Sequence, residues 1–424
     1  EEHGHFLGRQ YGFRCKHSTD MAIIDMVERI RKAWDTGDHC MGIFVDLRKA
    51  FDTVDHQILI SKLEHAGVRG IPLELLKSYF QNRRQYVVFQ GTESSQLEMT
   101  CGVPQGSILG PLFFLLYVND LARSSDFFRF VLFADDTNLF ASAKTKGELY
   151  KKVQGELGLV SDWFACNKLT LNYKKTEYID FSKPGNSSAD KHILKIDGQR
   201  LLKVNQSKFL GVLIDQNLSW RAHIQKIITK MKQTMGLIGR AKGFMDEAQV
   251  LLLYNTMVLP HLQYCLINWG NFAGDGNLKL MREILTLQKS FVRIITASPP
   301  KSHADPLFAR LRTLKIEDLF DQRVRLFSYK SHNNQLPSEM SAILGKVSDG
   351  HSHNTRGARC NLFVSRDNIR SIRYIAPKIW NALDEKLKTS GSVSGFKNKS
   401  KEEFLLGYSK FRCNIKGCYS CNLP

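Results

Sequence analysis

The stretch FVLFADDTNLFA, residues 130–141, governs how the rest of the chain is interpreted. Apolar residues lie on both sides of an acidic pair, Asp135 and Asp136. Two short apolar runs around a polar centre predict a β-hairpin. The hairpin would hold both carboxylates at its tip, because burying an unpaired charge costs too much free energy. Taken alone, the stretch also permits an ordinary solvated turn.

A second acidic strand end occurs earlier in the chain. The apolar run Met41 to Val45 ends on Asp46. Carboxylates at two strand ends predict a single metal site, because Mg²⁺ prefers oxygen ligands and completes its shell with waters and substrate phosphates. Two such ions about 4 Å apart suit phosphoryl transfer. We expect Asp46 and Asp135 to be the metal ligands and Asp136 to assist them.

Several short motifs occur together, in the order FVD (44–46), AFD (50–52), GVPQGS (102–107) and FADD (133–136). This series resembles the palm of a reverse transcriptase, and its details are similar to the enzymes of non-LTR retrotransposons, jockey-like lineages in particular. The resemblance implies an α+β fold: a right-hand polymerase palm, with an antiparallel sheet and helices, followed by a helical thumb and an α-rich C-terminal region. It runs from about Gln10 through the tail and is most specific between Phe44 and Gly211.

The resemblance also implies an activity, RNA-directed DNA polymerisation. A primer 3′-hydroxyl would attack the α-phosphate of a dNTP on an RNA template and release pyrophosphate, with two Mg²⁺ ions held by Asp46 and Asp135. Two alternatives stay open. An inactive nucleic-acid-binding remnant is one, because upstream fingers strands are expected and not visible. An RNA-dependent RNA polymerase, which shares the two-metal palm, is the other.

Four residues are expected at the nucleotide. An aromatic such as Phe51 would lie beneath the sugar in the resembling family and clash with a 2′-hydroxyl, although a core phenylalanine is the plain alternative. Asn172, Lys175 and Thr176 match the next palm motif, in which the lysine lies near the triphosphate. The predicted dNTP-binding residues are Phe51, Gln105, Lys175 and Arg14.

Template and primer contacts are expected in three places. Glycines permit backbone conformations that other residues avoid, which suits a loop lying against a template base. Phe209-Leu210-Gly211 resembles the primer grip, at the head of a strand through Ile214. A helix after Trp220 carries lysines opposite an apolar face, which indicates either duplex contact or simple solvation. The predicted residues are Gly102, Pro104, Gly106, Phe209, Leu210, Gly211, Lys226 and Lys230.

We predict four regions along the chain. They are partial fingers (1–40), the palm (41–215), the helical thumb (216–300) and an α-rich C-terminal region with a cysteine-rich end (301–424). In that end, Cys413, Cys418 and Cys421 have the short spacing that suits tetrahedral Zn²⁺. A zinc knuckle cut short and a metal-free tail are both compatible with three visible ligands.

The composition of the chain indicates what kind of partner and cellular setting to expect. The net charge of +19 on 424 residues favours a polyanionic partner, because phosphate neutralisation dominates nucleic-acid affinity. No apolar run reaches the roughly 20 residues of a membrane helix. Nine cysteines without a regular framework predict a reducing, intracellular setting, in cytoplasm and nucleus, with no targeting signal identified. The start at Glu1 is expected to fall inside a domain, and any endonuclease function is expected outside this chain.

Overall fold

The computed structural model describes residues 6–183, 192–271, 277–347, 361–365 and 369–409. The chain forms two compact units. The first contains residues 1–22 and 32–210, and the second contains residues 23–31 and 211–424. This partition does not test the predicted division into fingers, palm and thumb.

A five-stranded sheet organises the first unit, in the order β11-β8-β1-β7-β6. Its central strand, β1 (His39–Val45), is buried over its last six residues, as expected for an apolar run covered on both faces. It pairs antiparallel with both neighbours. The remaining strands are β6 (Arg129–Phe133), β7 (Asp136–Ala143), β8 (Glu177–Phe181) and the short β11 (Leu202–Lys203), which runs parallel to β8.

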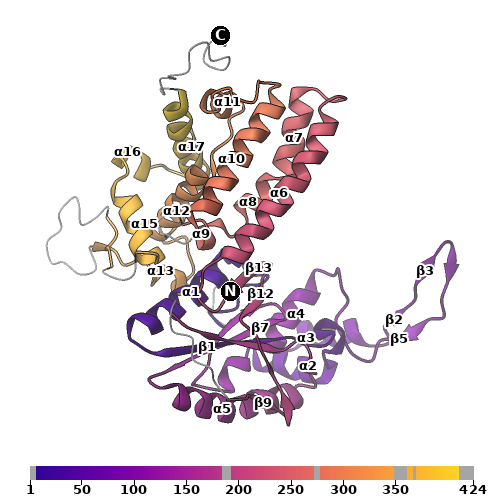
Figure 1. Ribbon diagram of the computed structural model, residues 1–424. Coiled ribbons are helices and arrows are strands. Elements are labelled where there is room, and N and C mark those ends of the chain that lie inside the picture. Colours follow the sequence, from indigo (N-terminus) through magenta and orange to yellow (C-terminus); the bar gives the residue numbers. More distant parts are fainter. Residues whose placement is uncertain (1–5, 184–191, 272–276, 348–360, 366–368, 410–424) are drawn as a thin grey trace. The chain divides into compact units, whose positions relative to one another are not determined.

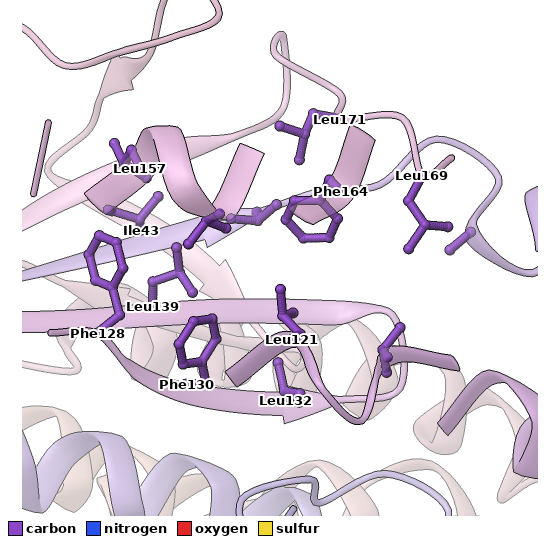
Figure 2. Packing of buried hydrophobic residues seen from close by; sticks show 14 of the residues in the cluster. Ile43, Leu121, Phe128, Phe130, Leu132, Leu139, Leu157, Phe164, Leu169 and Leu171 are labelled. Atoms are coloured by element: carbon purple, nitrogen blue, oxygen red, sulfur yellow. The ribbon is translucent and has the colours of Figure 1, made fainter. Parts of the chain in front are cut away.

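Helices and apolar side chains complete this unit's core. Helix α5 (Lys146–Cys166) buries one face, including Leu157 and Phe164, and both belong to the same buried apolar cluster as Ile43 and Leu139 of the sheet (Figure 2). Removing such side chains from water is the main stabilising contribution. The other helical elements are α1 (Thr19–Asp35), η1 (Ala50–Thr53), α2 (His56–His65), α3 (Ile71–Phe80), α4 (Leu109–Val118) and η2 (Leu121–Arg123).

Short ribbons project from the first unit. Over residues 86–89 only Val88–Phe89 is a strand, and both of its residues are exposed. Figure 1 shows this ribbon reaching away from the body of its unit. The ribbon strands are β2 (Arg84–Gln85), β3 (Val88–Phe89), β4 (Thr92–Glu93) and β5 (Leu97–Glu98), and β9 (Lys195–Ile196) pairs with β10 (Gln199–Arg200).

The predicted primer-grip strand is wrong in form. Phe209 does not head a strand that continues to Ile214. It ends β12 (Gln206–Phe209), and the chain then turns through Leu210 and Gly211, whose φ values are +45° and +84°. Strand β13 (Val212–Asp215) follows the turn. Two successive positive φ angles reverse the chain, which a continuous strand cannot do.

The second unit is helical in its described part apart from β13 and an isolated bridge between Lys346 and Leu362. Helix α6 (Arg221–Ala241) buries Ile224, Ile227 and Met231 and exposes Lys226 and Lys230, as predicted. With the sheet of the first unit, these helices confirm the α+β class. The other helices are α7 (Glu247–Met257), α8 (Leu259–Gln263), α9 (Leu266–Trp269), α10 (Leu278–Ile295), α11 (Asp305–Arg310), α12 (Ile316–His332), α13 (Ser338–Ser341), α15 (Ile372–Asn381), α16 (Glu385–Lys388) and α17 (Val393–Ser409).

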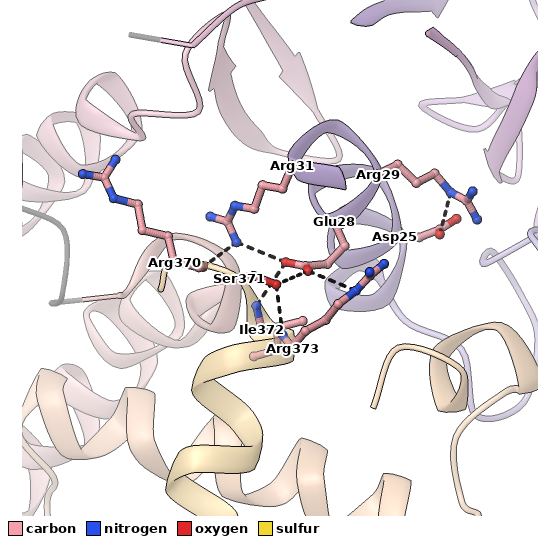
Figure 3. Close-up of polar contacts among 8 residues, drawn as sticks. All are labelled: Asp25, Glu28, Arg29, Arg31, Arg370, Ser371, Ile372 and Arg373. Carbon is pink, nitrogen blue, oxygen red and sulfur yellow. Dashed lines mark hydrogen bonds and ion pairs between the residues drawn. The ribbon is translucent and has the colours of Figure 1, made fainter. Parts of the chain in front are cut away.

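A buried carboxylate ties the middle of α1 to α15 within the second unit. Glu28, on α1, is 3% exposed and accepts hydrogen bonds from the Ser371 hydroxyl and from the Ile372 amide at 3.1 Å. It also pairs with Arg31 at 3.1 Å (Figure 3). The Glu28 carboxylate therefore satisfies the free Ile372 amide at the start of α15, where a negative charge is favourable. Among the described helices, none is long and apolar enough to cross a membrane.

Because the imidazole of His223 is buried, we expect the folding stability of the second unit to fall at acidic pH. Burial, assisted by Lys226, lowers the pKa of His223 from 6.5 to about 4. Below pH 6.5 the unfolded chain takes up a proton that the folded chain resists, so stability present above pH 6.5 is lost as the pH falls toward 4. At pH 5 the loss from this residue is about 2 kcal/mol.

The measurement is urea unfolding at pH 7.5 and pH 5, followed by tryptophan fluorescence, because the His223 ring lies 5.5 Å from that of Trp269. We expect His223→Asn to lose less stability than the wild type between these two pH values. Asparagine still offers an acceptor to the Leu213 amide, which donates to His223 Nδ1 at 3.4 Å. An equal loss in both proteins would contradict the prediction.

Candidate active site

Three carboxylates converge at one end of the sheet. Val45 of β1 pairs with Thr137 of β7, so in an antiparallel register the next residue of β1, Asp46, falls beside Asp136. Asp135 occupies the two-residue turn that joins β6 to β7. The predicted hairpin is confirmed, with one correction: Asp136 is not at the tip but is the first residue of β7, opposite Phe133.

The pKa of one carboxylate in this cluster departs from the ordinary value of an aspartate. The pKa of Asp136 is raised to about 6, first by partial burial of its carboxylate and then by the charges of Asp135 and Asp46, while Lys208 opposes the rise. Like charges at short range each disfavour the ionised form of the other. The cluster is thus a place where a cation would relieve repulsion.

The donor set suits a hard divalent cation only if other oxygens contribute. In the described ranges no three side chains are arranged so that they alone enclose a metal ion. Mg²⁺ usually retains waters and takes substrate phosphate oxygens beside one or two carboxylates. An open group of aspartates is therefore compatible with Mg²⁺ and does not resemble a closed structural site.

The segment after α5 holds Asp46 in place. The Asn172 side-chain amide donates to Asp46 Oδ2 at 2.8 Å, and the Asn172 backbone amide donates to the Asp46 carbonyl at 2.9 Å. The Asp46 amide in turn donates to the Thr176 hydroxyl at 3.3 Å. Thr176 is 1% exposed. These contacts give Asn172 and Thr176, noted in the sequence only as motif matches, a concrete role in orienting Asp46.

The GVPQGS loop docks on η1, just after Asp46. The Gly102 amide donates to the Val54 carbonyl at 2.7 Å, and the Val103 amide donates to the Phe51 carbonyl at 2.8 Å. The Gln105 side chain donates to Asp52 at 2.8 Å. The Pro104 carbonyl accepts from the Ser107 hydroxyl at 2.7 Å, which keeps the loop compact. Hydrogen bonds thus hold the predicted loop residues against the AFD motif. Within the loop, Gly106 adopts a φ of +78°.

The predicted nucleotide residues differ in what they contact. The Phe51 ring stacks on Phe114 with centroids 4.4 Å apart, and its residue is half-buried. Lys175 is exposed and, among the described residues, its ammonium has no partner. Arg14 donates through Nη1 to the Leu7 carbonyl at 2.7 Å. Part of the Arg14 guanidinium therefore organises its own segment, a use that the sequence did not indicate.

The predicted primer and zinc residues are spread over different parts of the chain. Phe209 is buried, with its ring 6.0 Å from that of Phe44 on β1. Gly211 belongs to the second unit, as do the exposed lysines Lys226 and Lys230. The cysteine group proposed for zinc lies outside the described residues: Cys413, Cys418 and Cys421.

Two residues near the acidic cluster escaped the sequence interpretation. Lys208, on β12, lies close enough to Asp136 to lower its pKa. Gln10 contacts the turn beside Asp135. Neither has a signal in its local sequence, because both contacts depend on pairings between distant segments.

Comparison with known proteins identifies the family. The family described as reverse transcriptase (RNA-dependent DNA polymerase) matches residues 1–214 of the 424. The chain belongs to the reverse transcriptase family. The match contains the acidic cluster, the GVPQGS loop and the five-stranded sheet.

Curated relatives come from non-LTR elements. A probable RNA-directed DNA polymerase from transposon X-element of Drosophila melanogaster is 28% identical over 349 residues, which are 78% of this chain and 37% of the relative. The RNA-directed DNA polymerase from mobile element jockey of Drosophila funebris is 26% identical over 77% of this chain and 36% of the relative. These figures bear out the resemblance to jockey-like enzymes. The chain spans little more than a third of these relatives.

Solved structures with some similarity include a telomerase. The telomerase from Candida albicans, in complex with the TWJ fragment of telomeric RNA, aligns with a TM-score of 0.35 and 14% identity. The alignment covers 73% of this chain and 52% of that chain.

The two glycines of the GVPQGS loop should differ in how much stability the protein loses when each is replaced by alanine. Both have positive φ, which costs an alanine about 1 kcal/mol. A Cβ at Gly102 would also lie 2.7 Å from the Asp52 carbonyl oxygen, whereas at Gly106 it would meet nothing within 4 Å. We expect Gly106→Ala to lower the free energy of unfolding by about 1 kcal/mol and Gly102→Ala by about 2–4 kcal/mol, since overpacking adds to backbone strain.

Urea unfolding of the two variants beside the wild type measures the difference. Equal costs would show that the loop yields at Gly102 without disturbing η1, and would contradict its tight docking.

Proposed function

We propose that this chain is the polymerase part of a non-LTR retrotransposon reverse transcriptase, an RNA-directed DNA polymerase that transfers a nucleotide from dNTP to a primer 3′-hydroxyl. The convergence of Asp46, Asp135 and Asp136 at one end of the sheet carries the proposal. Family membership and the named activities of the curated relatives support it. Because the relatives are much longer than the chain, their template, primer and nucleotide substrates enter here as part of the proposal.

The acidic cluster would hold divalent metal, which reverse transcriptases generally require. Asp46 and Asp135 would bind two Mg²⁺ ions, with Asp136 assisting. When bound, the metal ions stabilise negative charge on the attacking and leaving oxygens. Asn172 keeps Asp46 Oδ2 oriented through its 2.8 Å hydrogen bond. The exposed ammonium of Lys208 balances part of the acidic charge at Asp136.

Other residues of the chain would select and position the substrates. The half-buried Phe51 ring, fixed by its stacking on Phe114, would lie beneath the sugar of the incoming dNTP. The exposed Lys175 would contact the triphosphate, and the docked GVPQGS loop would support the template base. Lys226 and Lys230 on α6 would meet duplex phosphates. Arg14 stays a weaker candidate for the triphosphate, since its Nη1 is already hydrogen-bonded to the chain.

Neutralising either predicted metal ligand tests the activity directly. We expect Asp46→Asn and Asp135→Asn to lower primer extension on an RNA template by at least about a thousandfold, since each removes a charge that the metal needs. Asp162→Asn, an exposed aspartate on α5, is the matched control and should extend normally. Circular dichroism and the thermal midpoint check that all three variants fold.

The same assay separates the proposal from an inactive remnant. Salt-sensitive binding of an RNA–DNA duplex without extension by the wild-type chain would favour a nucleic-acid-binding fragment. Extension by the wild type that survives Asp135→Asn would refute the assigned metal site.

Sugar selection gives a second, independent prediction. Truncation of Phe51 should remove the clash with a 2′-hydroxyl, so Phe51→Ala should raise the ratio of NTP to dNTP incorporation by about 10-fold or more, a range typical of steric discrimination. The ratio is insensitive to the fraction of folded enzyme, which the loss of stacking on Phe114 will reduce. A wild type that prefers NTPs would instead indicate an RNA polymerase.

A further inference from the structure

The segment before α1 runs alongside the outer edge of β6. The Tyr11 amide donates to the Leu132 carbonyl at 2.8 Å, and the Leu132 amide donates to the Arg9 carbonyl at 3.0 Å. These bonds form a parallel bridge between Gln10 and Leu132. The bridge at Leu132 lies two residues before Ala134, the first residue of the turn that carries Asp135.

The Gln10 side chain reaches from this bridge into the turn. Gln10 is 2% exposed, and its Oε1 accepts hydrogen bonds from the Gly12 amide at 2.9 Å and the Ala134 amide at 3.1 Å. Both partners are N–H donors, so the oxygen must face them. Ala134 directly precedes Asp135 and adopts a φ of +54°, a conformation that an alanine holds only when its surroundings require it.

Gly12 closes on the same turn from its backbone side. A Cβ at Gly12 would lie 2.5 Å from the Ala134 amide nitrogen and 3.0 Å from the Phe133 carbonyl carbon. Those atoms belong to the backbone and cannot rotate away, so only glycine permits this approach. Gln10 and Gly12 therefore touch the turn at adjoining points.

The chain around Gln10 is itself anchored. Arg14 Nη1 donates to the Leu7 carbonyl at 2.7 Å and approaches the Gln10 carbonyl at 3.4 Å. The Leu7 amide donates to the Asn119 side chain at 2.7 Å. Meanwhile Gln10 Nε2 is buried and has no hydrogen-bond partner among the described residues.

We propose that Gln10 and Gly12 are positioning residues that clamp the Ala134–Asp135 turn and thereby fix the Asp135 carboxylate for catalysis. The catalytic half of this inference rests on the proposed polymerase function. Asp135 is exposed, so the position of its carboxylate depends on the backbone of the turn, and a displacement of about 1 Å at a reacting group can cost about a hundredfold in rate. The clamp supplies the missing restraint from a segment outside the sheet motifs.

Hydrogen exchange tests the clamp without reference to activity. Gln10→Met keeps the side-chain length and removes the acceptor, so the Ala134 amide should exchange at least about 10-fold faster in peptides that span the turn. Amides in the middle of β7 should keep their protection. The control is Gln154→Met, because Gln154 makes a comparable pair of bonds to the backbone of Lys195, at 2.8 and 2.9 Å, beside a different hairpin. Unchanged exchange at the turn in Gln10→Met would overturn the clamp.

Single-turnover extension tests the consequence for catalysis. Gln10→Met and Gly12→Ala should each lower the maximal rate by about 10-fold or more, with the dNTP concentration for half-maximal rate changed less than about threefold, because binding is not what the clamp serves. The double variant should lose less than the product of the single effects, since both residues act on one turn. Gln154→Met should retain the wild-type rate. Faster exchange at the turn with an unchanged rate would overturn the inference.

If the wild-type chain extends no primer, the proposed function fails, and Mn²⁺ binding then decides the clamp. Weaker Mn²⁺ affinity in Gln10→Met than in both the wild type and Gln154→Met would support a clamp that orders the acidic turn. Equal affinity in all three proteins would overturn it.

Discussion

The register between β1 and β7 brings three negative charges to one end of a sheet, and the surrounding structure has to hold them there. Asp46, Asp135 and Asp136 carry like charges at short range, and burial followed by these neighbouring charges raises the pKa of Asp136. The strands stay paired because β1 is buried over its last six residues, so separating it from its neighbours would expose apolar side chains to water. The apolar packing of the sheet thus opposes the repulsion of the acids.

Asp46 and the turn that carries Asp135 are each held in place by a different segment of the chain. Asp46 is oriented by Asn172 and Thr176, which follow α5. The turn that carries Asp135 is met by Gln10 and Gly12, which precede α1. The supporting residues are neutral, so they restrain the carboxylates through hydrogen bonds and close contact and leave the negative charge available to a cation.

Local patterns predicted much of this fold, because the physics that produced them is local. The FVLFADDTNLFA hairpin and the buried run ending on Asp46 need only short-range alternation and turn chemistry. The lysine face of α6 follows from helical spacing alone. The same sequence could not reveal the contact of Gln10 with Ala134, which lies 124 positions away, or the proximity of Lys208 to Asp136. The predicted strand from Phe209 through Ile214 was wrong for a related reason: chain reversal at Leu210 and Gly211, not composition, decides where β12 ends.

The buried Glu28 belongs to a stretch of α1 that groups with a distant part of the sequence and not with its immediate neighbours in the chain. The middle of α1, residues 23–31, belongs to the unit otherwise built from residues 211–424, and Glu28 depends on Ser371 and Ile372 for its hydrogen bonds. A protein cut after residue 214, where the family match ends, would leave that carboxylate and the apolar side chains around it without their cover. The stretch that matches the reverse transcriptase family therefore shares the middle of its first long helix with the unit built mainly from residues 211–424.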